Sequence, residues 1–162
     1  MPYLDTNLIN NSSLACFLLV NFIKQYEDAS VDGTHPDLMK LLLVLPFAWH
    51  ETSRNAIKGR NFSTLLDNVL QEEPLLKSNL TRRVSNYSGV SIQGLNLAAA
   101  SGLIKRIECH DADQFVTDFD RWPTGVKATL PTEMTKTTKR LANWFCIMDT
   151  PSLYKVLFGD QL

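Results

Sequence analysis

The sequence predicts a mainly helical α+β fold in which one short β-hairpin interrupts a series of helices. Apolar residues recur at helical spacing through most of the 162 residues, and a pair of short strand patterns lies within residues 103–119. No internal repeat, low-complexity tract or long linker divides the chain. We therefore expect a single domain over residues 1–162, with N-terminal helices at 13–58, a winged-helix-like part at 62–120 and C-terminal helices at 131–159.

The N-terminal part opens with a strong helix-start pattern, NNSS at residues 10–13. Short hydroxyl and amide side chains there accept hydrogen bonds from the free N–H groups of the first turn. The following helix, expected from residue 14 to about 27, is apolar nearly all round in its first half. Such a helix is either deeply buried or partly covered by another chain, and we expect it to contact a partner.

Residues 38–54 (LMKLLLVLPFAWHETSR) form the run around which the rest of the chain is organised. The run is apolar on every side, yet it is shorter than the roughly 20 residues of a membrane span. We expect a core helix that stops or kinks at Pro46, because the proline ring clashes with the preceding turn. This helix would deliver Trp49, His50 and Arg54 to the surface.

The middle of the chain has the order of a winged helix. Apolar spacing predicts helices at about 62–72, 76–87 and 91–100, with SerGlyVal at residues 88–90 as the turn between the last two. LIKRIEC and QFVTDF then read as strands joined by the turn HDAD at residues 110–113. Two helices joined by a tight turn and followed by a hairpin are typical of this fold.

The C-terminal part consists of a loop and two helices. The segment 121–130 contains Trp122, Pro123 and Gly125 and reads as loop. A helix is expected from Pro131 to about residue 149, and a short final helix after Pro151. The wet face of the longer helix is expected to carry Lys136, Lys139, Arg140 and Asn143.

Charge is unevenly distributed, although the net charge is only −1. Residues 1–75 carry a net −4, residues 76–107 a net +5, residues 108–120 a net −5 and the remainder a net +3. The basic stretch suggests contact with phosphate or with an acidic partner, against the simpler interpretation of a solvated basic face. The candidate residues for this contact are Arg82, Arg83, Lys105 and Arg106.

One hypothesis for the function of this chain is a winged-helix protein that binds DNA on its own, as the alternative to a protein that docks onto partner proteins. In helix-turn-helix proteins the second helix places polar side chains against base edges. Here that helix, residues 91–100, has no charged residue, and only Gln93 and Asn96 could reach a base. The acidic residues of the hairpin would also be repelled by phosphates. Possible DNA binding is therefore the weaker hypothesis, and docking onto partner proteins is the stronger one.

The sequence shows no pattern of an enzyme, and we expect no catalytic residue, no metal and no cofactor. Cys109–His110 is one pair where a structural zinc site needs four ligands. Asp118 and Asp120 could serve a metal-dependent nuclease, but a solvated strand end explains them better. The three cysteines show no disulfide framework, and the first residues show no secretory signal, so a cytoplasmic location is expected.

Aromatic and arginine side chains offer candidate partner contacts, because Trp, Tyr and Arg dominate interface energetics. Trp49, His50 and Arg54 either anchor a partner or form an ordinary helix end with a snorkelling aromatic and a capping histidine. Trp144 and Phe145 are adjacent on one helix and face different ways, so one of them is expected to pack on the terminal helix or on a partner.

Two motifs resemble a known family. Residues 45–54 (LPFAWHETSR) resemble the LP-xxx-H-xx-[ST]-R signature of the middle component of bacterial ABC three-component systems. Residues 139–159 (KRLANWFCIMDTPSLYKVLFG) look like the C-terminal pattern of that family, with LFG where LLG is frequent. The opening residues 7–19 are similar to its NPAF start, with Ser12–Ser13 in place of Pro-Ala. The likeness covers nearly the whole chain in order and length.

The resemblance implies a small adaptor that bridges an ABC-type ATPase of the DNA-repair kind and a third, effector-linked protein. Such systems are thought to defend bacteria against phages and other mobile elements. The resemblance also implies a hetero-oligomer that does not contact a membrane and contacts nucleic acid at most indirectly. Adjacent basic and acidic stretches would suit docking onto charged partner surfaces.

Overall fold

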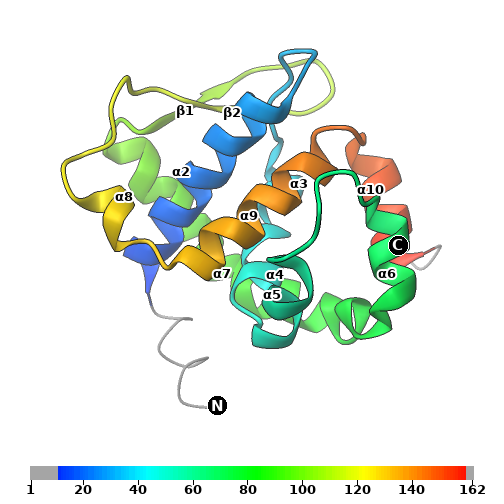
Figure 1. Ribbon diagram of the computed structural model, residues 1–162. Coiled ribbons are helices and arrows are strands. Elements are labelled where there is room, and N and C mark those ends of the chain that lie inside the picture. The colour runs from blue at the N-terminus through cyan, green and yellow to red at the C-terminus, as the bar shows by residue number, and fades with distance from the viewer. Residues whose placement is uncertain (1–10, 160–162) are drawn as a thin grey trace.

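The fold is built around α2 (Ser12–Ala29), which lies in the middle of the molecule and packs against α7 and α9 (Figure 1). The structure is a computed structural model that describes residues 11–159, so residues 7–10 of the opening motif lie outside the described residues. Asn11 caps the helix by accepting the N–H of Leu14 at 2.9 Å. The predicted helix is confirmed, and most of its apolar side chains are buried by this chain, while Leu14 and Phe17 are half-buried.

The run at residues 38–54 folds as three short helices, and the predicted stop or kink at Pro46 is wrong. The helices are α3 (Leu38–Leu41), α4 (Val44–Ala48) and α5 (Glu51–Ile57). Helical structure is interrupted both before α4 and after it. Pro46 lies in the first turn of α4, where a backbone N–H would have no intrahelical acceptor, so proline costs little there.

Lys40 is a buried lysine that ties α3 to the end of α9 (Thr132–Phe145). Its ammonium donates to the carbonyls of Phe145 at 2.8 Å and Met148 at 2.6 Å, and to the Tyr26 hydroxyl at 2.9 Å. Burial lowers the pKa of Lys40, while nearby Asp37 acts in the opposite direction. All three donors are used, and a cation at the C-terminal end of a helix is also favoured by the helix dipole.

The middle of the chain contains one long helix, so the predicted turn at residues 88–90 is wrong. After α6 (Leu66–Glu72) and the 3₁₀ turn η1 (Pro74–Lys77), α7 runs without a break from Leu80 to Ala100. Gly94 explains why: a Cβ there would lie 2.9 Å from the Cys16 backbone nitrogen, so α7 and α2 approach at their backbones. This packing favours helix through residues whose local preference is a turn.

The predicted β-hairpin is confirmed, with β1 (Ile104–Ile107) antiparallel to β2 (Gln114–Thr117). The hairpin docks on α2 through Glu27, whose carboxylate accepts the backbone N–H and the hydroxyl of Thr117, each at 2.7 Å. Because α7 is continuous from Leu80 to Ala100, the hairpin does not follow the two turn-linked helices predicted for a winged helix. The chain is mainly helical with one small antiparallel hairpin.

The C-terminal helices α9 and α10 (Thr150–Phe158) are confirmed, with α9 ending earlier than predicted. Asp149 caps α10 by accepting the N–H of Ser152 at 2.7 Å. The segment expected to be loop contains one short helix, α8 (Val126–Thr129). A single buried apolar cluster includes residues of the N-terminal, middle and C-terminal parts. Within residues 11–159 no helix is both long enough and apolar enough to cross a membrane.

Candidate functional site

Trp49 lies in the core, so its predicted place at the surface is wrong. Its side chain is 1% exposed, and its ring meets that of Tyr87 edge-on with the centroids 5.8 Å apart. The short helix α4 ends at this residue and turns the indole inward. The motif residue therefore joins α4 to α7 inside the molecule.

His50 and Arg54 organise the turn that follows. His50 is the N-cap of α5: its Nδ1 lies 3.4 Å from the Ser53 backbone nitrogen and 2.8 Å from the Ser53 hydroxyl oxygen. Arg54 donates to the Ala48 carbonyl at 3.0 Å and lies 3.8 Å from the Glu133 carboxylate. The expected capping histidine is confirmed for this segment, whereas the expected snorkelling aromatic is wrong because Trp49 is buried.

Trp144 is buried as well, at 3% exposure. Its Nε1–H donates to the Thr64 carbonyl at 2.8 Å, which pins the loop before α6 to α9. Phe145 on the next face is fully buried against Phe22. Both aromatic residues are therefore buried inside this chain, and the expectation that one of them packs on the terminal helix or on a partner stays a prediction.

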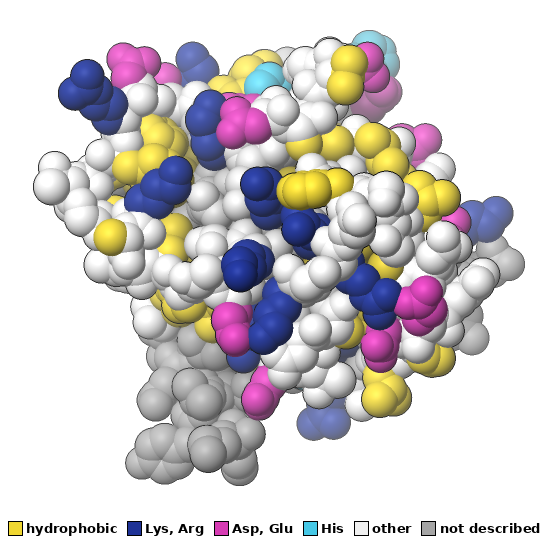
Figure 2. Space-filling model, in the orientation of Figure 1, with side chains coloured by type: hydrophobic (Ala, Val, Ile, Leu, Met, Phe, Trp, Pro, Cys, Tyr) yellow, Lys and Arg dark blue, Asp and Glu magenta, His cyan; other side chains and the backbone are white. Residues whose placement is uncertain are grey.

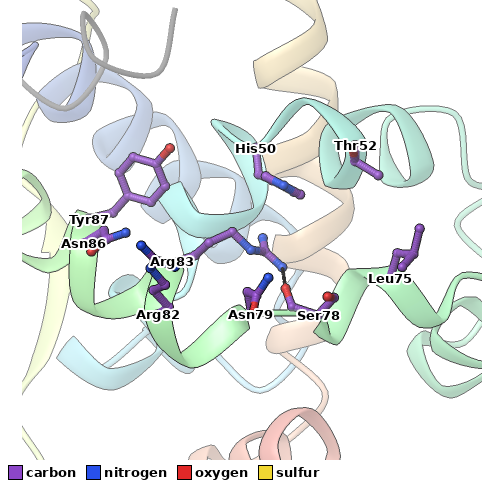
Figure 3. Close-up of a pocket in the computed structure, with 9 residues that line it drawn as sticks. All are labelled: His50, Thr52, Leu75, Ser78, Asn79, Arg82, Arg83, Asn86 and Tyr87. Carbon is purple, nitrogen blue, oxygen red and sulfur yellow. Dashed lines mark hydrogen bonds between the residues drawn. The ribbon is translucent and has the colours of Figure 1, made fainter. Parts of the chain in front are cut away.

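The two adjacent arginines of α7 have different environments. Arg83 is 8% exposed and is part of the interior, whereas Arg82 is exposed. Both line a cavity of about 390 Å³ at the start of α7. Figure 3 shows Arg82, Arg83 and Asn86 on α7 facing His50 and Thr52 across this cavity. The interpretation of Arg83 as part of a solvated basic face is wrong.

Lys105 and Arg106 do not join this pair. They lie on β1, which follows α7 in the chain. The far end of α7 is about 27 Å along the helix axis from Arg82, at a rise of 1.5 Å per residue. Each has an acidic neighbour on the hairpin: Lys105 lies 3.8 Å from Asp118, and Arg106 lies 3.3 Å from Asp113. The two basic residues of the hairpin are thus paired with two of the five acidic residues of the 108–120 stretch.

A second basic group, expected from the sequence to be the wet face of a helix, lies along α9. We call it the α9 basic surface, and it consists of Phe62, Lys136, Lys139 and Arg140. Phe62 is 54% exposed, with the Arg140 guanidinium 3.8 Å and the Lys139 ammonium 5.3 Å from its ring centroid. Figure 2 shows Lys and Arg side chains concentrated on the face where Figure 1 places α9.

The sequence contains the residues of this surface but does not show that they come together. Phe62 fits the helical spacing of residues 62–72, which predicted a buried position. In the structure α6 begins only at Leu66, so Phe62 lies in the preceding loop and stacks under α9. Only the tertiary contact between this loop and α9 brings the aromatic ring to the cations.

No group of three or more His, Cys, Asp or Glu side chains within residues 11–159 is arranged to hold a metal ion. Asp118, a candidate for nuclease chemistry, lies beside Lys105 at the hairpin. Cys16, Cys109 and Cys146 are free thiols, and burial raises the pKa of Cys16 to about 11. A thiol with such a pKa is a core group and a poor nucleophile.

Comparison with known proteins gives one match. The family model described as ABC-three component (ABC-3C) system Middle Component 3 matches residues 4–158. No curated protein and no solved structure matches the chain. The family model covers α2 to α10, including the capped turn around His50 and the C-terminal helices. The chain belongs to the family of middle components of ABC-three component systems.

Proposed function

We propose that the protein is a non-enzymatic adaptor that bridges an ABC-type, DNA-repair-like ATPase and a third, effector-linked component in the cytoplasm. Its biological role would be bacterial defence against phages and other mobile elements. Family membership supports partner proteins in general, since a middle component works within a multi-component system. The specific partners and the defence role are our proposal.

The observation that carries the proposal is the α9 basic surface. An aromatic ring that remains half-exposed while two cations lie over it combines the residue types that contribute most to binding at interfaces. Lys136 and Lys139 add positive charge around it, which would orient an acidic partner surface and raise the association rate. We assign this surface, and not the buried Trp49 and Trp144, to a partner.

The motif residues Trp49, His50, Arg54 and Trp144 then have an indirect role. Their contacts hold α4, α5 and the 61–65 loop against α7 and α9. Substituting them would weaken partner binding by displacing the α9 basic surface, and the free energy of unfolding would fall at the same time. Changing the α9 basic surface would weaken binding without a loss of stability.

The experiment is co-purification of the chain with its operon-encoded ATPase and third component, followed by a titration of whichever contact forms. Phe62→Ala should weaken binding about 30-fold, because truncation of a central aromatic contact costs about 2 kcal/mol. Lys139→Glu should weaken it further as salt is lowered, since the repulsion is less screened.

Matched controls are available on the same chain. Ile147→Ala removes an apolar side chain that is 70% exposed, beyond the end of α9, and Lys77→Glu reverses an exposed charge on η1. Both should leave binding within about twofold, as expected of surface changes outside an interface. A monodisperse monomer that ignores both neighbours would refute the adaptor role. Equal losses in Ile147→Ala and Phe62→Ala would refute the surface assignment.

A further inference from the structure

The cavity at the start of α7 is built from three elements that meet only in the folded chain. Ser78 and Asn79 form the junction between η1 and α7, Arg82 and Arg83 follow in the first turn, and His50 lies opposite at the start of α5 (Figure 3). Its volume of about 390 Å³ is in the range of small-molecule sites. Its lining consists almost entirely of hydrogen-bonding side chains.

The charge of this cavity is uncompensated. Among residues 11–159, two arginines line it and no carboxylate does. Arg83 donates only to neutral acceptors: the carbonyls of Pro46 at 2.6 Å and Leu76 at 2.7 Å, the Ser78 carbonyl at 3.2 Å and the Ser53 hydroxyl at 3.1 Å. Its Nε–H is buried and has no acceptor within residues 11–159. A buried cation without an anion is costly, so an anion in the cavity would be stabilising.

Burial also lowers the pKa of the Arg83 guanidinium, which is the direction expected for a cation held among neutral groups. Arg82 has no ion-pair partner among the described residues, although the chain pairs both Lys105 and Arg106 with aspartates elsewhere. The two arginines thus form an anion-attracting pair that this chain does not neutralise itself.

The end of α7 adds to the same field. This helix has 21 residues, and its N-cap residue Asn79 makes no side-chain cap hydrogen bond. Asn79 has a φ of 54°, the left-handed region, and is the only non-glycine with positive φ within residues 11–159. The N–H groups of the first turn therefore have no side-chain acceptor at the cap, and the positive end of the helix dipole faces the cavity.

We propose that this cavity is a binding site for a phosphate monoester. The two arginines match the charge of a dianion better than that of one carboxylate. The amide of Asn79 and the hydroxyl of Thr52 supply further donors for its oxygens. A duplex backbone would need a row of exposed cations, and the cavity offers only Arg82. The phosphate belongs either to a small metabolite or to the end of a nucleic-acid strand.

The test uses the lone full-length chain and calorimetric titration with adenosine 5′-monophosphate, inorganic phosphate and adenosine. We expect the two phosphates to bind and adenosine not to bind. Arg82→Gln should weaken phosphate binding about tenfold or more, since it removes charge-assisted hydrogen bonds. Arg106→Gln removes the same charge from another exposed arginine, on β1, and should change binding less than about twofold.

A single-stranded oligonucleotide with a 5′-phosphate, compared with the same strand bearing a 5′-hydroxyl, distinguishes the two sources of phosphate. Tighter binding of the phosphorylated strand than of the mononucleotide assigns the site to a nucleic-acid end, and equal or weaker binding assigns it to a small ligand. Failure of every phosphate probe to bind, or equal losses in Arg82→Gln and Arg106→Gln, would overturn the proposal. Because no partner protein is present, this outcome is independent of the adaptor function.

Discussion

The structural role of Lys40 is not apparent from its neighbours in the sequence. In the run LMKLLLVLP it looks like a charged interruption of an apolar segment, yet it is 6% exposed and donates to three oxygens. Two of these oxygens are carbonyls at the end of α9, more than 100 residues away. A buried ammonium is tolerated because each of its donors has an acceptor.

Replacing Lys40 by methionine should therefore destabilise the protein by about 1–3 kcal/mol, the cost of leaving buried acceptors without a donor. Urea denaturation followed by circular dichroism measures this change. Lys24→Met is the control, because Lys24 is exposed on α2 and pairs only with Asp28, and its effect should stay within about 0.5 kcal/mol. If both variants unfold at the same urea concentration, the three hydrogen bonds contribute nothing net.

At the scale of the elements, α7 is the helix whose local sequence and final structure differ most. SerGlyVal at residues 88–90 favours a turn, and the structure has helix. The difference arises from Gly94, whose missing side chain lets α7 lie against the backbone of α2 at Ala15 and Cys16. Burial along this contact outweighs the weak local preference for a turn.

Two glycines of α7 make a matched pair for a test. Gly94→Ala would place a Cβ 2.9–3.0 Å from backbone atoms of α2 that cannot move aside, so we expect destabilisation of about 1–3 kcal/mol. Gly89→Ala meets no atom within 4 Å and lies inside the helix, so it should stabilise the protein by up to about 1 kcal/mol. Thermal denaturation of both variants checks the signs. Destabilisation by Gly89→Ala would instead support the turn.

At the scale of the whole molecule, the protein is a set of short elements arranged around one helix that is buried on nearly every side. Both the hairpin, through Glu27, and the long helices α7 and α9 pack on α2. The outer elements carry the α9 basic surface and the cavity at the start of α7, which is lined by the exposed Arg82 and the buried Arg83. The core around α2 is therefore separate from the outer elements for which we propose binding roles.

This arrangement predicts a hierarchy of hydrogen exchange. The amides of α2 between Leu18 and Ile23 should exchange only on global unfolding, because their side chains are fully buried among α7 and α9. The amides of residues 121–131, around the short exposed helix α8, should exchange many times faster through local opening. Mass-spectrometric exchange on the intact chain measures both. Early exchange of α2 would show that it is not the centre of the fold.

The sequence by itself determined the mainly helical class, the hairpin at residues 104–117, the starts of α2 and α10 and the family. These properties depend on local periodicity, on capping side chains and on short motifs, all of which are readable within a few residues. Only the tertiary structure decided that Trp49, Trp144 and Arg83 are interior, that α7 is continuous and that Phe62 lies under Arg140. Burial and ion pairing depend on which distant segments of the chain meet in the folded protein. The contact between α2 and α7, where two backbones pack closely, is one such meeting.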